Sequence, residues 1–431
     1  MKERSILKQK SVIKKTFLII TVFLFMLSFA GCGGQNSKNY KETSSKNIKQ
    51  LSEREKVKDF KYMYKILKEN YPFFEVNKRL NNIDWLSKKD EYIQRVKGSE
   101  NDDEFYHALE SILEELNNGH TDMVDKSLYL YMRDVYEPLG KITEPWTKEL
   151  KKEKVVSRYS GNGDKKLSST KDGAGQYIEP NNIKTAIIEE GSVGYLHIKS
   201  FNTFNIEGDM KIIKHFLQSI KNYKVLIIDI RGNDGGDSRY WSDNLVPMLI
   251  NKPIKNTEIC AYRGGKFSED FIKAMNEYNH ETLIPIKNIE NEGLKNMPLE
   301  FKKDFKCYSK NEEIINPKDS INFKGKIYLL VDREVYSSAE KFATFAKSTG
   351  FATLIGEKTG GDGIGSDPLV CALPNSGYVF RFSCDMGLTS DGTCNEEFKT
   401  EPDFITPSMI DQNLLNDKCV KKVLELEKIK R

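Results

Sequence analysis

The chain has few of the residues that bind metal ions. Among its 431 residues are only five histidines and seven cysteines. No two cysteines form a C-x-x-C pair, and no histidine lies beside them at the spacing of zinc ligands. The sequence therefore predicts neither a metal site nor a cofactor.

A strong charge of one sign is absent from the body of the chain. The formal net charge is +4, but residues 1–15 alone carry six Lys or Arg and one acid. The rest of the chain is close to neutral, so no basic field remains to attract nucleic acid. We expect no nucleic-acid partner.

An apolar run at residues 16–30 is too short to span a bilayer comfortably and has the length of a secretory signal. It follows the basic N-terminus and ends in Leu-Ser-Phe-Ala-Gly-Cys at 27–32, which resembles a bacterial lipoprotein signal. That resemblance implies removal of residues 1–31, lipidation of Cys32 and a tether over 32–52 on the extracytoplasmic face of the cell membrane. An ordinary signal peptide or an uncleaved anchor is the alternative.

The cysteines beyond Cys32 could form disulfides, because an exported location permits them. Cys384 and Cys394 flank a turn-like Asp-Gly at 391–392 and could pair across a hairpin. Buried free thiols fit the same pattern, and the sequence does not decide between the two.

Residues 53–120 are predicted to form a helical N-terminal subdomain. Two apolar stripes at helical spacing occupy this segment, and Asn101 with Glu104 three residues later is typical of a helix start. The stripes consist of Val57, Phe60, Tyr64 and Leu67, and of Phe105, Leu109, Ile112 and Leu116. Residues 121–190 are aromatic, charged and predicted to be a loop-rich connecting region, with a mobile loop at 157–176.

Residues 191–410 show an alternation of strands and helices, and 411–431 are expected to end the chain with a helix. The run 225–230 is continuously apolar, which suits a strand buried on both faces. A helix is predicted over 210–220, and residues 281–322 are a polar insertion of unassigned structure. Further strands are predicted at 193–198, 257–263, 327–331, 352–356 and 377–383. This alternation indicates an α/β domain.

Ser337 lies at a turn from the strand at 327–331 into a segment with Ala339, Phe342 and Ala343 at helical spacing. A serine at such a turn has its hydroxyl off the core, near the positive end of a helix dipole. That is where an attacking oxygen and its oxyanion partners are useful. The alternative is a simple N-cap, because serine is favoured at helix starts.

Three further motifs contain candidate functional residues. His120 lies in Asn-Gly-His-Thr at 118–121, past a predicted helix end. It could act as a general base, or it could simply interact with helix-end carbonyls. Gly235 and Gly236 follow the buried strand and let the backbone approach a ligand closely. A glycine-rich turn at 355–363 is not a phosphate loop, because it lacks the Gly-Lys-[Ser/Thr] ending.

The order and spacing of these motifs together resemble the S41 family of serine peptidases over residues 53–410. That family includes the tail-specific proteases, the tricorn core protease and retinoid-binding relatives. The resemblance implies a crotonase/ClpP-like α/β spiral domain preceded by the helical N-terminal subdomain, with the active site between them. It also implies a membrane-anchored serine peptidase that acts on peptide or protein substrates.

The resemblance also implies the roles of particular residues. Ser337 would be the nucleophile, and His120, which matches the histidine of the tricorn-like branch, would be its general base. Glu396, or alternatively Glu397, would orient His120 directly or through a hydroxyl. The tricorn core protease has a serine at the position of Gly119, so any orienting hydroxyl from that position is missing here.

The remaining family positions concern the oxyanion and the base. The amides of Ser338 and of Gly235 or Gly236 would hold the oxyanion. Tail-specific proteases instead activate their serine with a lysine, and that position is occupied here by Asp362, which cannot act as the amine does. Lys358 lies nearby in the sequence and is the weaker alternative base.

Two other classes of function fit parts of the pattern. One is a non-catalytic lipoprotein that binds peptides or hydrophobic ligands, as the retinoid-binding relatives illustrate, and a degenerate peptidase would be a related case. The other is an acyl-CoA enzyme of the crotonase type, which is disfavoured because an exported location lacks that cofactor. The presence of both Ser337 and His120 argues for the peptidase.

Overall fold

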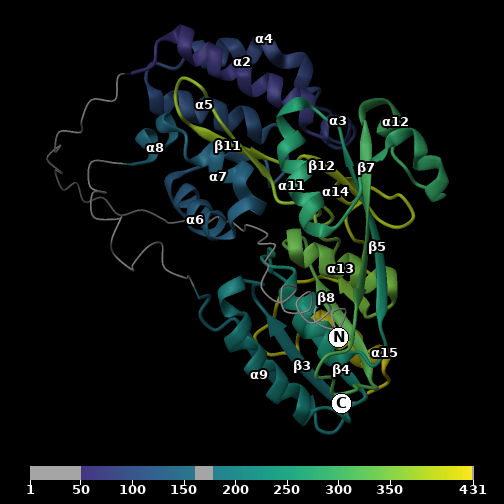
Figure 1. The fold of residues 1–431 in the computed structure, drawn as a ribbon. Helices are drawn as coiled ribbons and strands as arrows, with labels where there is room; N and C mark the ends of the chain where they lie inside the picture. The colour runs from purple at the N-terminus through teal and green to yellow at the C-terminus, as the bar shows by residue number, and fades with distance from the viewer. Residues whose placement is uncertain (1–49, 161–177, 430–431) are drawn as a thin grey trace, which may run out of the picture.

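The computed structural model describes residues 50–160 and 178–429 (Figure 1). The predicted signal, Cys32 and nearly all of the predicted tether and mobile loop lie outside these residues. Within the described ranges, no helix is both long enough and apolar enough to cross a membrane. The six cysteines from Cys260 to Cys419 are all free, so Cys384 and Cys394 are buried thiols and form no disulfide.

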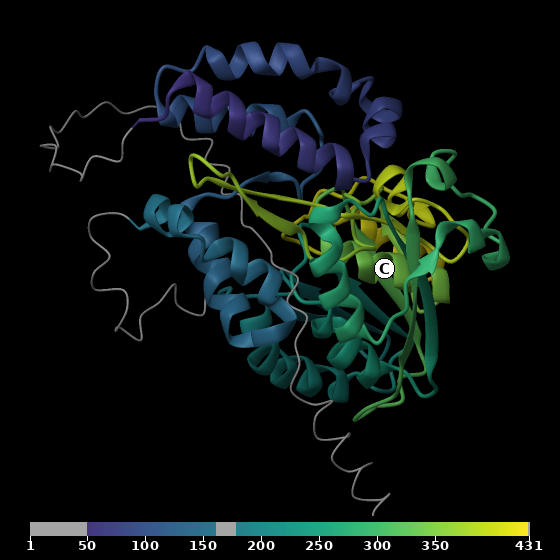
Figure 2. The same cartoon turned by 45° about the horizontal axis from the view of Figure 1, so that its top comes forward.

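The predicted helical subdomain is present and forms a separate layer at the top of Figure 2. It starts with a capping box in which the side chains of Ser52 and Glu55 each accept a hydrogen bond from the other's backbone N–H. Asn101 caps a later helix by accepting from the amide of Glu104, as predicted. The two apolar stripes point into one core, apart from the half-buried Val57. The helices are α2 (Glu53–Asn70), α3 (Phe74–Asn81), η1 (Trp85–Lys88), α4 (Lys89–Lys97) and α5 (Asp102–Glu114).

The connecting region is less loop-rich than the sequence suggests. Its aromatic residues pack as a helical core, with Tyr136 and Trp146 buried and their rings 5.8 Å apart. Tyr129 and Tyr159 stack at 4.5 Å. The elements are β1 (Asp122–Met123), α6 (Lys126–Tyr136), η2 (Glu137–Thr143), α7 (Glu144–Leu150) and α8 (Glu153–Tyr159).

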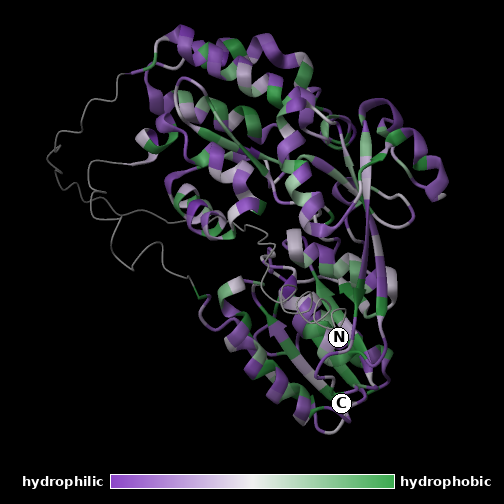
Figure 3. Cartoon of the chain, viewed as in Figure 1, coloured by the Kyte–Doolittle hydropathy of each residue, from purple (hydrophilic) through white to green (hydrophobic). Residues whose placement is uncertain are grey.

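A six-stranded sheet lies in the lower half of the molecule in Figure 1. Its order is β13-β9-β8-β4-β3-β2, and neighbours are parallel except for the edge pair of β2 and β3. One face packs against α9 (Ile206–Ser219) and α13 (Ser337–Thr349), and the other packs against α15 (Lys418–Leu426). The side chains of β4 pack on both faces of the sheet, which accounts for its apolar run. Figure 3 colours the ribbon by hydropathy and shows hydrophobic residues of the sheet in green. The strands are β2 (Ile183–Glu189), β3 (Val193–Ile198), β4 (Val225–Asp229), β8 (Lys326–Val331), β9 (Thr353–Gly356) and β13 (Phe404–Ile405).

Two smaller antiparallel sheets join this sheet to the helical layer. In the sheet β1-β11-β10, Asp122 of β1 pairs with Arg381 of β11, which ties the segment after α5 to the C-terminal half of the chain. The sheet β12-β5-β7-β6 contains two strands of the insertion at 281–322, β6 and β7, and β7 pairs along the whole of β5. Its strands are β5 (Ile254–Tyr262), β6 (Ile284–Pro285), β7 (Cys307–Ile315) and β12 (Asp385–Leu388); β10 spans Leu369–Ala372 and β11 spans Val379–Phe382.

The remaining elements are short and mostly cover these sheets. They are η4 (Thr203–Asn205), η5 (Tyr240–Leu245), α10 (Val246–Leu249), η6 (Lys266–Ser268), α11 (Glu269–Asn279), η7 (Ile286–Glu292), α12 (Phe301–Asp304) and α14 (Asn395–Phe398). The chain is thus a mixed α/β protein with a helical N-terminal region and a central sheet, in agreement with the expected fold class.

Candidate active site

Ser337 is the first residue of α13, directly after the turn that follows β8. Its φ of 53° lies in the left-handed region, a strained conformation that costs about 1–3 kcal/mol and often occurs at functional sites. The helix is capped at Tyr336 without a side-chain hydrogen bond. Among the described residues, the Ser337 hydroxyl donates and accepts no hydrogen bond, while its amide donates to the carbonyl of Gly361 at 3.3 Å. The N-cap interpretation is therefore wrong, and the hydroxyl is unengaged.

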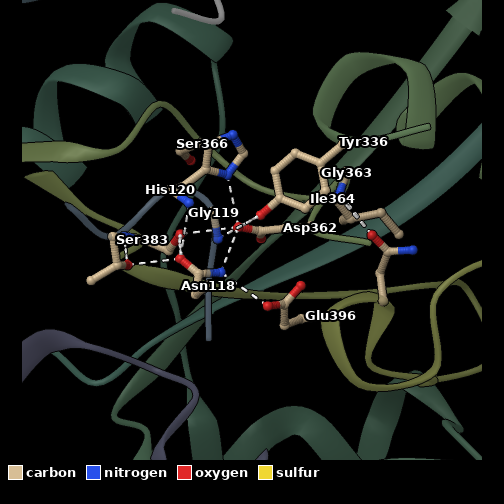
Figure 4. Close-up of polar contacts among 12 residues, drawn as sticks. Asn118, Gly119, His120, Tyr336, Asp362, Gly363, Ile364, Ser366, Ser383 and Glu396 are labelled. Carbon is tan, nitrogen blue, oxygen red and sulfur yellow. Dashed lines mark hydrogen bonds and ion pairs between the residues drawn. The ribbon is translucent and has the colours of Figure 1, made fainter. Parts of the chain in front are cut away.

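His120 lies between α5 and β1 and is held by a buried carboxylate (Figure 4). Its Nδ1 is 2.7 Å from Oδ2 of Asp362, and both side chains are less than a tenth exposed. Because an ionised carboxylate only accepts hydrogen bonds, Nδ1 carries the proton of the neutral ring and Nε2 keeps its lone pair. Nε2 is buried and has no hydrogen-bond partner among the described residues. The ring is thus in the tautomer that a general base requires.

Asp362 is itself surrounded by hydrogen-bond donors. Its Oδ2 accepts from Asn118 Nδ2 at 2.9 Å, Ser383 Oγ at 3.1 Å and the Tyr336 hydroxyl at 3.3 Å. Burial opposes ionisation of this carboxyl, but its interaction with His120 and the hydrogen bonds from Asn118 and Ser383 outweigh burial and lower the pKa of Asp362 below its usual value. The carboxylate is therefore ionised at neutral pH.

Tyr336 occupies the space beside Gly119 that a side chain would need. A Cβ atom on Gly119 would lie 3.0 Å from the Tyr336 hydroxyl oxygen, which accepts a hydrogen bond from the Gly119 amide at 3.2 Å. The tyrosine ring lies 5.0 Å from the ring of His120. The Tyr336 hydroxyl, which donates to Asp362 at 3.3 Å, thus supplies a hydroxyl next to Gly119.

Glu396, the predicted orienting residue, has no contact with His120. Its Oε1 accepts at 3.0 Å from the same Asn118 nitrogen that binds Asp362, and its Oε2 is buried without a partner. Burial and the nearby charge of Asp362 raise the pKa of Glu396 well above its usual value. Two carboxylates sharing one amide are not both ionised, so Asp362 holds the charge and Glu396 is neutral. Asp362 therefore occupies the position next to His120 that the family resemblance predicts for Glu396.

The two alternative residues lie outside this cluster. Glu397 forms a bidentate ion pair with Arg79 at 2.6 and 2.7 Å and has no hydrogen bond with His120 or Asp362. Lys358 is half-exposed and pairs with Glu401 at 3.1 Å. Neither residue joins His120 or Ser337.

The predicted oxyanion donors are not equally available. The Gly235 amide donates to the side chain of Asn233 at 2.9 Å and is therefore occupied. The amides of Gly236 and Ser338 form none of the hydrogen bonds found among the described residues. Gly236 must be glycine, because its φ is 125° and a Cβ there would lie 2.4 Å from the Phe201 carbonyl oxygen. Gly235 lies against Ser337 and Ser338, so the free amides of Ser338 and of Gly236, the next residue after Gly235, are the available donors near the serine.

The site contains the kinds of group that serine hydrolases use: a strained serine at a helix start, free amides near it and a histidine–aspartate pair. Residues 192–406 match peptidase family S41, and the chain belongs to this family.

Two solved structures illustrate the similarity of fold. A protein from Parabacteroides merdae described as a candidate peptidase has 21% sequence identity and a TM-score of 0.53, over 87% of this chain and 96% of that one. Mature CPAF in complex with lactacystin has 13% identity and a TM-score of 0.50, over 82% and 94%. At these identities the likeness is one of fold. No curated protein sequence matches the chain.

Proposed function

We propose that the protein is a serine peptidase in which His120 activates Ser337 and Asp362 orients His120. The observation that carries the proposal is the hydrogen bond from His120 Nδ1 to Asp362, which leaves Nε2 as a free base. Both residues are linked to the start of α13, because the amide of Ser337 bonds to Gly361, the residue before Asp362. The chain segment at 361–362 therefore connects the nucleophile to the base.

The reaction is acyl transfer to water. His120 Nε2 takes the Ser337 proton as the hydroxyl oxygen attacks a peptide carbonyl, and it then returns that proton to the leaving amine. The amides of Gly236 and Ser338 hold the oxyanion, each being worth about 3 kcal/mol in comparable sites. Water then attacks the acyl-enzyme, with His120 taking a proton from the water and giving it to the departing Ser337 oxygen. Asp362 remains ionised throughout and stabilises the charged ring.

We further propose that the peptidase works outside the cytoplasm, anchored through a lipid on Cys32. This part of the proposal is supported by the basic N-terminus, the apolar run and the cysteine that follows it. Labelling cells with a radioactive or alkyne fatty acid should mark the wild-type chain. A Cys32→Ala chain that still incorporates the fatty acid would contradict the anchor.

The test of the peptidase is hydrolysis of a denatured protein by the purified full-length chain, with new N-termini read by mass spectrometry. We expect cleavage that needs no added metal ion and that a fluorophosphonate stops. Binding of peptides without any cleavage would contradict the proposal and favour the non-catalytic lipoprotein.

Glu396→Gln distinguishes the two carboxylates of the site. Because Glu396 is neutral at pH 7, the amide is a close replacement, and we expect kcat/KM to change by less than about threefold. Because the pKa of Glu396 is raised in the fold, Glu396 contributes fully to stability below the usual pKa of an unfolded glutamate, about 4.3. This contribution is lost as pH rises from there through the pKa of the folded state. The variant does not titrate there, so its free energy of unfolding relative to wild type should increase with pH. A large loss of activity would return the orienting role to Glu396.

A further inference from the structure

A cavity of about 350 Å³ opens directly beside the proposed nucleophile. Ser338, next to the nucleophile, and Gly363, next to Asp362, form part of its wall. Other parts come from the connecting region, from η5 and α11, and from strands β5 and β7. Its volume lies at the lower end of the range of small-molecule pockets, so it can hold a group of the size of one side chain. Its place beside Ser337 makes it a pocket for a substrate side chain, if the proposed function is correct.

The charges on the cavity wall are unbalanced. The two cations of the wall are already paired: Arg239 with Asp237, and Lys341 with Glu258 at 3.1 Å. The carboxylates of Asp243, Glu281, Glu313 and Asp367 also line the cavity. Within the described part of the chain, none of these four lies within ion-pair distance of a cation.

Asp367 is the acid that most lacks a partner. Its Oδ1 is buried and forms no hydrogen bond with any described residue. Burial and the carboxylates of Asp237 and Asp385 raise its pKa well above the usual value, and Arg381 only partly offsets them. A carboxyl oxygen that is buried without a partner is costly, and a cation brought beside it would favour the ionised form of the acid.

Part of the wall is apolar. Leu139, Ile142, Trp146 and Met275 face the same cavity as the acids. A purely apolar substrate side chain would fill the space but would leave the carboxylates unpaired, and an acidic one would be repelled. Lysine and arginine have a methylene stem that packs on apolar surface and a cationic head that needs a carboxylate.

We propose that this cavity binds a lysine or arginine side chain of the peptide substrate, close to the bond that is cleaved. The stem lies along Trp146 and its apolar neighbours, and the cation meets Asp367. The protein is then a peptidase with a preference for basic residues.

The experiment begins with a random peptide library digested by the purified full-length chain. We expect Lys and Arg to be enriched at one fixed position beside the cut. Two fluorogenic peptides are then made that differ only there, one with lysine and one with norleucine, which keeps the stem and lacks the ammonium. Asp367→Asn should lower the ratio of their kcat/KM values about tenfold. Glu313→Gln, in the same wall, should lower it in the same direction and serves as a second variant.

Glu207→Gln is the matched control, because Glu207 is an exposed acid outside this cavity that pairs with Lys211 at 2.8 Å. It should leave the ratio as in wild type. Cleavage without a basic preference, or an unchanged ratio in both cavity variants, would overturn this inference while the proposed peptidase stood. If the chain neither cleaves any peptide nor reacts with a fluorophosphonate, the proposed function fails, and this inference with it.

Discussion

Ser337→Ala is expected to reduce peptide hydrolysis to the background rate, a loss of about 10⁶-fold in kcat for enzymes whose residues act as one unit. The fold should persist, because the Ser337 hydroxyl makes no hydrogen bond among the described residues and alanine fits the same space. The measurement is kcat/KM on a fluorogenic peptide, together with the thermal unfolding midpoint.

Ser348→Ala is the matched control for this change. Ser348 lies on the same helix, α13, and its hydroxyl donates to the carbonyl of Phe345 at 3.2 Å, remote from the site. The control should keep full activity. Activity retained in Ser337→Ala, or lost equally in both variants, would remove Ser337 from the mechanism.

Asp362→Asn is expected to lower kcat by about 10⁴-fold, as the loss of the carboxylate does in triads of this kind. The amide can donate to Nδ1, which favours the tautomer with its proton on Nε2, so the ring can no longer take the Ser337 proton. It also supplies no charge to stabilise the protonated ring. KM should change little, because Asp362 is buried beneath His120 and does not reach the substrate.

The comparison with Glu396→Gln makes this prediction specific. Both changes replace a buried acid by its amide, and both acids accept from Asn118. Equal losses of activity in the two variants would contradict the assignment of the charge to Asp362.

Much of the fold could be predicted from the chain because its elements are regular. The predicted strands at 193–198 and 225–230 agree with β3 and β4, whose residues are mostly apolar. Strand β7 was missed because its exposed face alternates charged residues with apolar ones in a polar insertion. The helices of the connecting region were missed because their aromatic residues are interspersed with charges and prolines.

The site was only partly predictable, for a different reason. Ser337, His120 and the glycines belong to local motifs, which a single sequence shows. The partner of His120 is 242 residues away, and only the pairing of β1 with β11 and the turn at Asp362 bring the two together. In the sequence, Asp362 stands at the position of the lysine of tail-specific proteases. The one local signal of its role is its place between two glycines, Gly361 and Gly363, in a glycine-rich turn.

The most direct test of the account is the position of a fluorophosphonate adduct on the purified chain. The reagent needs a serine whose proton is removed by a neighbouring base. Tandem mass spectrometry should find the adduct on Ser337 in the wild-type chain and should find none in His120→Ala, which keeps the serine but lacks the base. An adduct on another residue, or equal labelling of Ser337 in His120→Ala, would contradict the account.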